Sequence, residues 1–197
     1  MYKFLIFISF SLVYNTLNAQ EASIKWAPID TLDAVLNDES NQKQVFIDVY
    51  TDWCGWCKRM DATTFSDPEV VKIMNKYFVP VKFDAEQKEP IAFGGKQFKF
   101  VDNGRRGYNE LAASLLQEKM SYPTVVFLDE NAQMIQPLPG YRSAKDLKPI
   151  LVFIGKKIYK EQSYEDFLKT YEKEEWSSRL EYTSTFTPLI EQSKVNQ

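Results

Sequence analysis

Both cysteines of this 197-residue chain stand in one short segment, Thr51-Asp52-Trp53-Cys54-Gly55-Trp56-Cys57-Lys58. Two thiols with two residues between them can hold a metal ion, close a structural disulfide, or exchange electrons as a dithiol–disulfide couple. The chain contains no histidine, which excludes Cys-His and Ser-His-Asp catalysis as well as histidine metal sites. The cysteine pair is therefore the main candidate for chemistry in this sequence.

A metal site and a structural disulfide are the first two alternatives. Structural zinc takes four ligands, usually thiolates and imidazoles, so carboxylates or a second subunit would have to complete a site at Cys54 and Cys57. A soft ion such as Cu(I) would suit the two thiolates better than zinc. A disulfide that closes only four residues stabilises a fold by about 2 kcal/mol, against about 4.7 kcal/mol for a hundred-residue loop. We therefore expect neither a metal nor a bound cofactor.

The redox alternative also explains where the cysteines stand. Residues 45–50 form a near-continuous β-branched and aromatic run, which predicts a strand buried on both faces. Cys54 follows at the start of a predicted helix, where unpaired amide N–H groups and partial positive charge stabilise a thiolate. Cys57 comes one helical turn later, close enough to attack a mixed disulfide formed at Cys54. This placement favours a redox-active pair.

The elements around this segment alternate between helices and strands, which predicts an α/β fold. Residues 85–107 break the alternation and predict an inserted loop or hairpin, and Pro149 is expected to kink the last helix. The predicted helices cover residues 30–36, 58–63, 68–78, 108–119 and 143–157, and the predicted strands cover residues 45–50, 79–84, 125–128 and 133–136.

The two ends of the chain predict export and a C-terminal extension. Residues 1–19 contain Lys3, an apolar run from Phe4 to Val13, and Ala19 as a cleavage position, which is typical of a signal peptide. A membrane anchor would need roughly 20 apolar residues, so we expect no stable membrane insertion once the signal is removed. The predicted domains are a signal peptide (1–19), a folded domain (20–160, with the insertion at 85–107) and a C-terminal helical extension (161–197). The extension could pack on the domain or bind a partner.

Charge limits the partners. The chain has 24 Lys and Arg residues against 27 Asp and Glu residues, a net charge of −3, which argues against binding nucleic acid. Four basic residues do gather in the insertion, and they could contact an acidic partner, although such clusters are usually only solvated. They are Lys96, Lys99, Arg105 and Arg106.

The segment 45–58 resembles the thioredoxin superfamily, especially its exported members and the C-terminal domain of transmembrane thiol reductases of the DsbD type. Trp53 before the first cysteine and Lys58 after the second fit the family pattern, and Asp48 falls where thioredoxins have a buried acid. Tyr122-Pro123-Thr124, before a hydrophobic strand, resembles the family's cis-proline loop. The resemblance covers residues 24–160 and implies a thioredoxin-like fold, in which helices flank both faces of a central mixed sheet.

The resemblance also implies a role for each residue of the pair. Cys54 would be the attacking thiolate and Cys57 the resolving thiol. Asp48 would take a proton from Cys57 through water, and burial of this carboxylate in an apolar strand should raise its pKa toward neutrality. The alternative for Asp48 is a buried hydrogen-bond acceptor without a catalytic role.

Other residues would bind the substrate. Pro123 is expected to be cis, which would leave the Tyr122 backbone free to pair with an extended substrate segment. Trp53 and Trp56 are expected to form an apolar platform around the disulfide, with ordinary packing as the alternative, and Lys58 would play a supporting role. Trp56 stands where thioredoxins usually have proline, which leaves the direction of electron transfer open.

The sequence therefore predicts a thiol–disulfide oxidoreductase, periplasmic or secreted, that reduces disulfides in other proteins through Cys54 and Cys57. Its electrons would come from a membrane thiol carrier. The alternatives are a disulfide oxidase or isomerase, and a non-catalytic binding module in which the disulfide stays closed.

Overall fold

The computed structural model describes residues 23–38 and 41–171. The predicted signal peptide, and the predicted extension beyond residue 171, lie outside these residues. The chain forms two compact units, one that ends at Lys148 and a second that begins at Pro149.

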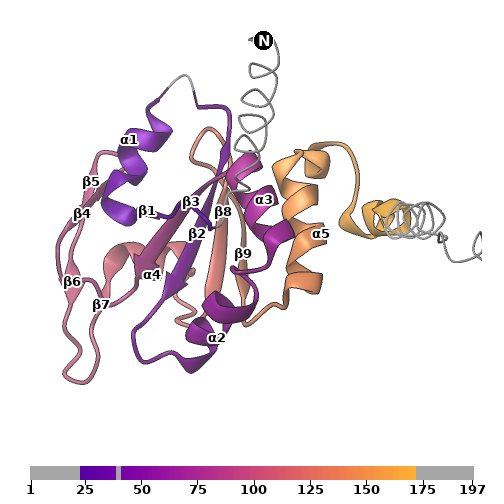
Figure 1. The fold of residues 1–197 in the computed structure, drawn as a ribbon. Helices are drawn as coiled ribbons and strands as arrows, with labels where there is room; N and C mark the ends of the chain where they lie inside the picture. Colours follow the sequence, from indigo (N-terminus) through magenta and orange to yellow (C-terminus); the bar gives the residue numbers. More distant parts are fainter. Residues whose placement is uncertain (1–22, 39–40, 172–197) are drawn as a thin grey trace, which may run out of the picture. The chain divides into compact units, whose positions relative to one another are not determined.

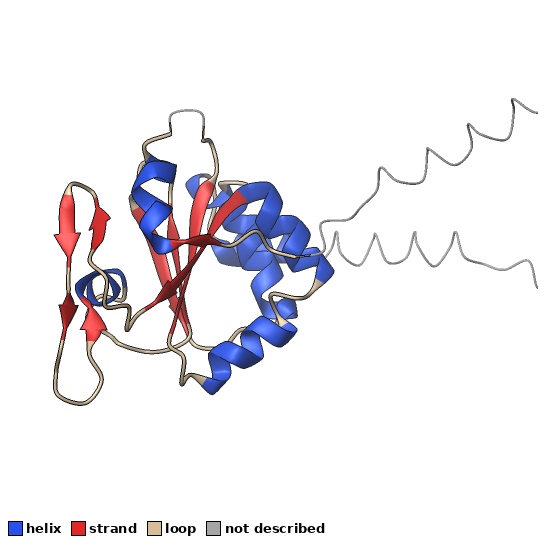
Figure 2. Ribbon diagram, turned by 60° about the vertical axis from the view of Figure 1, so that its left-hand side comes forward, coloured by secondary structure: helices blue, strands red, loops and turns tan. Residues whose placement is uncertain are grey.

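A five-stranded mixed sheet forms the centre of the first unit (Figures 1 and 2). Its strand order is β1-β3-β2-β8-β9, with β2 parallel to β3 and antiparallel to β8. Six of its seven residues are buried, as its apolar sequence predicted, because β2 lies mid-sheet and helices cover both faces there. The strands are β1 (Ala27–Pro28), β2 (Gln44–Tyr50), β3 (Phe78–Asp84), β8 (Thr124–Leu128) and β9 (Met134–Pro139).

Helices cover both faces of this sheet. On one face, α1 (Leu32–Leu36) and α4 (Glu110–Leu115) share a core cluster with Val45, Ile47 and Val49 of β2; the 3-10 turn η1 (Ile29–Thr31) precedes α1. On the other face lie α2 (Gly55–Thr63) and α3 (Pro68–Tyr77). This arrangement confirms the predicted α/β fold with helices on both faces of a mixed sheet.

An aromatic cluster fills the core on the α2 and α3 face. The Phe46 ring of β2 contacts four other rings, with centroids between 5.3 and 6.1 Å apart. Aromatic rings bury large apolar areas and gain further from edge-to-face contacts. The cluster therefore anchors the helix face on which the cysteines lie. Its other members are Trp26, Phe65, Phe78 and Phe127.

The start of α3 follows the sequence signal closely. The Asp67 carboxylate accepts the backbone N–H groups of Glu69 at 3.0 Å and Val70 at 3.1 Å. Pro68 occupies the first turn, where the missing N–H has no helical partner to lose. The predicted cap and the predicted first residue of this helix are both confirmed.

The predicted helix at residues 108–119 is wrong at both ends. Asn109 caps α4 instead of continuing a helix, because its side-chain oxygen accepts the N–H of Leu111 at 3.0 Å. At the other end, Gln117 and Glu118 have φ values of 53° and 62°, and this left-handed backbone ends the helix. The helix α4 is therefore only the middle of the predicted stretch.

Two short antiparallel hairpins occupy most of the insertion. In the first, β4 (Ile91–Phe93) pairs with β5 (Lys96–Phe98), and in the second, β6 (Phe100–Val101) pairs with β7 (Tyr108–Asn109). The two hairpins point in opposite directions, so the turn of the first and the loop of the second lie far apart in space (Figures 1 and 2).

Helix α5 (Ala144–Gly155) leads into the second unit and continues through Pro149 without a break. The 3-10 turn η2 (Ile158–Lys160) follows it, and residues 164–171 are again helical. The Phe153 ring lies 5.1 Å from Tyr164 and 5.2 Å from Phe167, measured between centroids. The described start of the predicted extension is thus a helix tied to the end of α5 by aromatic contacts.

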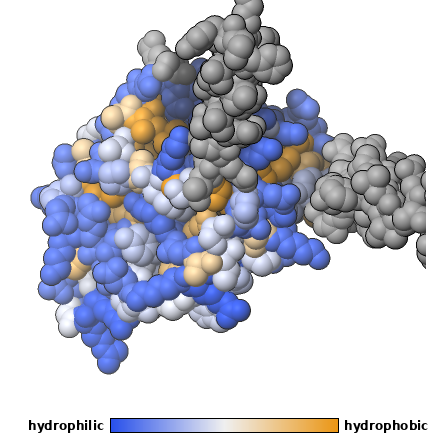
Figure 3. Space-filling model, viewed as in Figure 1, coloured by the Kyte–Doolittle hydropathy of each residue, from blue (hydrophilic) through white to orange (hydrophobic). Residues whose placement is uncertain are grey.

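The surface shown in Figure 3 is largely polar, and both edge strands of the sheet contain proline. The face in Figure 3 is mostly hydrophilic, with scattered hydrophobic patches. Proline occurs in both edge strands, as Pro28 in β1 and as Pro137 and Pro139 in β9. Across residues 23–38 and 41–171, no helix is both long and apolar enough to cross a membrane.

Candidate active site

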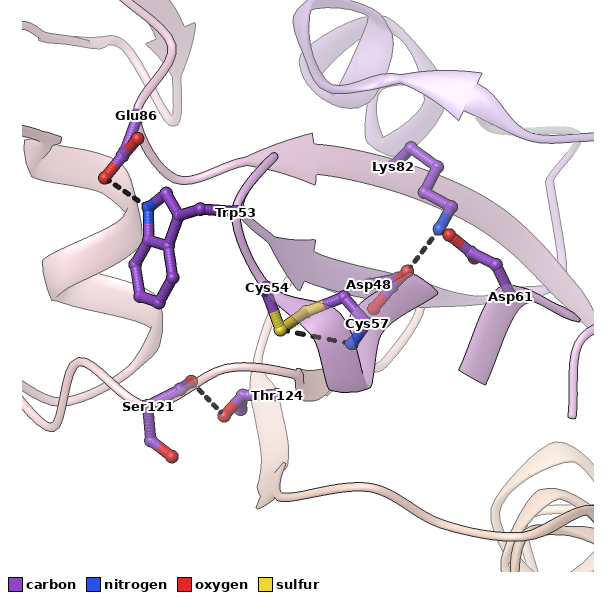
Figure 4. Close-up of a disulfide and its surroundings, with 9 residues drawn as sticks. All are labelled: Asp48, Trp53, Cys54, Cys57, Asp61, Lys82, Glu86, Ser121 and Thr124. Carbon is purple, nitrogen blue, oxygen red and sulfur yellow. Dashed lines mark hydrogen bonds and ion pairs between the residues drawn. A yellow bond between two sulfur atoms is a disulfide. The ribbon is translucent and has the colours of Figure 1, made fainter. Parts of the chain in front are cut away.

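The two cysteines form a disulfide at the start of α2. Cys54 is the N-cap residue of this helix, and Cys57 lies in its first turn, with their Cα atoms 5.3 Å apart. The backbone N–H of Cys57 donates a hydrogen bond to Cys54 Sγ at 3.1 Å (Figure 4). The helix begins at Gly55, so Cys54 lies at its N-terminus as the sequence predicted, where unpaired N–H groups favour a negative sulfur.

Both cysteines are nearly inaccessible while two neighbouring tryptophans are exposed. Cys54 is 5% exposed and Cys57 3%, whereas Trp53 is 49% and Trp56 56% exposed. Both rings therefore leave much of their surface open to solvent next to the buried disulfide. Lys58 is also exposed on this turn.

Trp53 is held by three segments that are distant in sequence. Its indole N–H donates to Glu86 Oε1 at 2.9 Å (Figure 4). Tyr122 meets it edge to face, with ring centroids 5.9 Å apart, and the Arg106 guanidinium lies 4.1 Å from the centre of the ring. These partners come from the loop after β3, the loop before β8, and the loop between β6 and β7. The orientation of Trp53 is therefore defined by tertiary contacts.

Trp56 is held on its own side of the disulfide. Its ring centroid lies 5.4 Å from that of Tyr141, and the Arg59 guanidinium lies 5.4 Å from its centre. Each exposed tryptophan thus has one tyrosine and one arginine against it, which limits the freedom of both rings.

The loop before β8 contains the predicted cis proline. The Tyr122–Pro123 peptide bond is cis, which confirms that prediction. The Thr124 hydroxyl donates to the Ser121 carbonyl at 2.7 Å, and the Gly140 N–H donates to the Pro123 carbonyl at 2.8 Å. Burial raises the pKa of Tyr122 to about 12, helped by the nearby acids Glu86 and Asp84, so its hydroxyl stays protonated.

Asp48 is a buried acid on β2. It is 2% exposed, and its Oδ2 accepts a hydrogen bond from Lys82 Nζ at 2.6 Å. Its Oδ1 has no hydrogen-bond partner among the described residues. Burial raises the pKa of Asp48 from 3.8 to about 6, although Lys82 opposes the increase. This confirms the predicted direction of the pKa shift and leaves one carboxylate oxygen available for a proton.

Sequence reasoning missed two partners of this acid. Lys82 Nζ also bonds Asp61 of α2, so one ammonium bridges two carboxylates. Burial lowers the pKa of Lys82, but Asp48 and Asp61 raise it more, and the net direction is upward. A signal did exist, because Lys82 is the one charged residue among the apolar residues 78–83, and strand register places it beside Asp48.

This acidic pair and lysine lie on the side of Cys57. Asp61 follows Cys57 by four residues in α2, so the two share one face of the helix. Asp48 shares a face of β2 with Phe46, whose ring contacts Phe65 directly after α2. The three charged side chains lie on the Cys57 side of the disulfide (Figure 4). This arrangement can take up and release a proton next to Cys57.

Within the part of the chain that the structure describes, no three or more Cys, Asp or Glu residues are grouped so that they could hold a metal ion. Asp48 and Asp61 are both engaged with Lys82.

These features together define a class of protein. Its members have a dithiol–disulfide pair at the start of the helix that follows the central strand of an α/β sheet, and a cis proline in the loop before a neighbouring strand. The family model of the thioredoxin-like domain matches residues 33–155, and the chain belongs to this family. A thioredoxin-fold protein from Helicobacter pylori has a similar structure, with a TM-score of 0.51 and 20% sequence identity over 71% of this chain and 87% of that chain. This likeness supports the fold.

Curated relatives agree with the redox class. The thiol:disulfide interchange protein DsbD of Campylobacter jejuni strain RM1221 is 24% identical over 134 residues, which is 63% of this chain and 21% of that protein. The protein of the same name from Citrobacter koseri is 43% identical over 53 residues, 25% of this chain and 9% of that protein. The chain thus spans only a small part of these relatives. The fold and the Cys-X-X-Cys pair together support thiol–disulfide oxidoreductase chemistry.

Proposed function

We propose that this chain is an exported thiol–disulfide oxidoreductase, periplasmic or secreted, that reduces disulfides in other proteins. One observation carries the proposal: the Cys54–Cys57 disulfide caps α2 while Asp48, with a pKa of about 6, lies on the Cys57 side. The signal-like N-terminus and the similarity to DsbD support export.

The reaction begins with the reduced pair, a Cys54 thiolate and a Cys57 thiol. The thiolate, stabilised by the Cys57 N–H and the other amides at the start of α2, attacks one sulfur of a substrate disulfide. The substrate S–S bond breaks, a new bond forms between Cys54 and the attacked sulfur, and the other substrate sulfur leaves and takes up a proton from water.

The second step regenerates the disulfide. Cys57 gives its proton to Asp48 and attacks Cys54 Sγ, so the Cys54–Cys57 bond forms, and the bond from Cys54 to the second substrate sulfur breaks. That sulfur leaves as a thiolate and takes up a proton from water. Two electrons have passed from the pair to the substrate. An external dithiol then reduces Cys54–Cys57 by the same exchange, and a membrane thiol carrier would fit this requirement. Asp48 releases its proton to water between cycles.

Substrate would bind over the exposed rim of the disulfide. Trp53 and Trp56 offer apolar surface on either side, and the backbone at Tyr122 beside Pro123 can pair with an extended segment. Lys58 adds a positive charge on the same turn. Because both sulfurs are nearly buried, a substrate cysteine has to enter between these groups.

Trapping of substrate tests the assigned roles. The Cys57→Ser variant should accumulate mixed disulfides between Cys54 and substrate proteins, because the resolving thiol is missing, whereas Cys54→Ser should accumulate none. Non-reducing gels and mass spectrometry of the linked peptides measure this. Trapping by Cys54→Ser alone would reverse the two roles.

One observation favours a second function, a binding module with a permanently closed disulfide. The cysteines are only 5% and 3% exposed, as in many structural disulfides. A midpoint potential below about −300 mV, together with no reduction of insulin, would support the module over the reductase. Reshuffling of scrambled disulfides faster than net reduction would instead identify an isomerase.

A further inference from the structure

The loop between β6 and β7 brings basic residues to the edge of the disulfide. Arg106 belongs to this loop, and its guanidinium lies 4.1 Å from the centre of the Trp53 ring, next to Cys54 in sequence. A cation over an aromatic face gains about 0.5–1 kcal/mol at an exposed site. The insertion is therefore part of the surface that an incoming substrate meets.

The loop holds Arg106 in place from its N-terminal side. The Asn103 side-chain oxygen accepts the N–H groups of Arg105 at 3.3 Å and Arg106 at 3.1 Å. Gly104, between Asn103 and Arg105, has a φ of 80°, a conformation that glycine adopts without strain. These two hydrogen bonds within the loop fix the backbone at both arginines.

Close packing holds the loop on the C-terminal side. A Cβ atom at Gly107 would overlap the Phe100 ring and lie 2.5 Å from the Val101 carbonyl oxygen. Only glycine fits this position against β6. Arg106 thus lies between a bonded turn and a tightly packed glycine.

The arginines have unused binding capacity. Asn103, Arg105 and Arg106 line a hollow of about 490 Å³. Both arginines are exposed, and no carboxylate among the described residues forms an ion pair with either of them. A guanidinium has its donors around the edge of its plane, so one that rests on an indole can still bind a carboxylate through two hydrogen bonds. Figure 3 shows a hydrophilic tip at this loop.

We propose that Arg106 and Arg105 select substrates by binding an Asp or Glu side chain close to the substrate disulfide. The inference rests on the proposed function and specifies its substrate class: proteins whose reducible cysteine is flanked by acidic residues. The chain as a whole carries a net charge of −3, which would repel such proteins. A local cationic hollow beside Trp53 overcomes that repulsion where exchange occurs and aligns the substrate with Cys54.

Matched peptides test this preference. Two disulfide-linked peptides differ only in the residues flanking the cysteine, Glu-Cys-Glu in one and Gln-Cys-Gln in the other. The measured quantity is the ratio of kcat/KM for the two peptides. The unsubstituted protein should favour the Glu peptide by about fivefold at low salt, as expected for one charge-assisted contact at a partly exposed site, and by less at 0.5 M NaCl.

Two variants locate the effect. Arg106→Gln should bring the ratio close to one. Lys96→Gln removes the same charge from the other end of the insertion, in β5, and should leave the ratio unchanged. A ratio that falls equally in both variants would indicate a general charge effect and would overturn the inference.

The outcomes separate this inference from the function on which it rests. If neither peptide is reduced, the proposed reductase function fails. If both peptides are reduced at equal rates, or if Arg106→Gln retains the preference, the function stands and the selection by Arg106 is wrong. Circular dichroism of Arg106→Gln verifies that this exposed substitution leaves the fold intact.

Discussion

At the scale of single residues, Asp48 links the protonation of the site to the stability of the fold. Burial raises its pKa from 3.8 to about 6, so the folded protein holds this proton more tightly than the unfolded chain does. The resulting stabilisation is present at low pH and is lost as pH rises from about 4 to about 6. The shift corresponds to about 3 kcal/mol at most.

The first prediction concerns Asp48→Asn. The variant should lack the decrease in the free energy of unfolding between pH 4 and pH 6, because the group that titrates there is gone. Urea unfolding across this range measures the change, with Asp30→Asn, an exposed acid on η1, as the control. An unchanged pH dependence in Asp48→Asn would assign the titration to another group.

The second prediction concerns activity. The carboxylate must be deprotonated to accept the Cys57 proton, so reduction by the unsubstituted protein should slow as pH falls below about 6. Asp48→Asn should reduce disulfides about tenfold more slowly or worse at pH 7 and lose this inflection. Stopped-flow measurement of disulfide exchange gives both values. A variant that is slow but keeps the inflection would point to a purely structural role for Asp48.

Residue identity predicted part of the site and missed its connections. The positions of the cysteine pair, the buried acid Asp48 and the cis peptide at Pro123 could be predicted, because their spacing matches a family pattern and a charged residue stands out in an apolar strand. The contact of Lys82 with Asp48 depends on strand register, which a pattern of single residues does not contain. The contacts of Trp53 join segments that are 33 residues or more apart in sequence, and no local signal predicts them.

At the scale of elements, the loop between β6 and β7 packs tightly on β6 at Gly107. The third prediction is that Gly107→Ala displaces the loop between β6 and β7, because the new methyl group would overlap the Phe100 ring. Overpacking of this kind costs about 1–3 kcal/mol. Thermal unfolding measures the loss, and the Glu-to-Gln peptide ratio should fall because Arg106 moves away from Trp53.

A paired substitution checks the cause. Phe100→Leu in the Gly107→Ala background should restore part of the stability, since it removes ring atoms from the overlap. Restoration should be incomplete, because the Val101 carbonyl oxygen still lies 2.5 Å from the new atom. No recovery at all would mean that the backbone contact with Val101 is the larger problem.

Element boundaries followed from sequence where a cap was readable. Asp67 and Pro68 defined the start of α3 correctly, because both residue types are specific for a helix N-terminus. The start of α4 was missed because Asn109, which is equally capable of capping, stands inside a run with a helical pattern. Its side chain also donates to the Gln87 carbonyl at 3.3 Å, a contact that is visible only in three dimensions.

At the scale of the whole molecule, the redox state should alter the stability of the fold. The fourth prediction is that the oxidised protein unfolds with a free energy about 2 kcal/mol higher than the reduced protein, the chain-entropy value for a four-residue loop. Urea unfolding with and without a reducing agent measures the difference. A more stable reduced form would mean that the fold favours the open dithiol, and that the protein works as an oxidant.

The overall architecture was predictable from sequence because two signals agreed. The run at residues 45–50 predicted a central strand, and the resemblance of the cysteine segment to thioredoxins predicted how the other elements surround it. The two hairpins within residues 91–109 had no counterpart in that pattern, so only an inserted loop or hairpin could be expected there. The contact of Arg106 with Trp53 joins residues distant in sequence, so it becomes visible only in the folded structure.

The prolines in the two outer strands have a consequence for the protein at high concentration. Pro28 at one border of the sheet, and Pro137 and Pro139 at the other, lack the N–H that a neighbouring copy would need for continuous backbone pairing. Stacking of molecules strand against strand into fibres is thereby disfavoured at both borders. The same two strands are thereby poor sites for a second copy of the chain to extend the sheet.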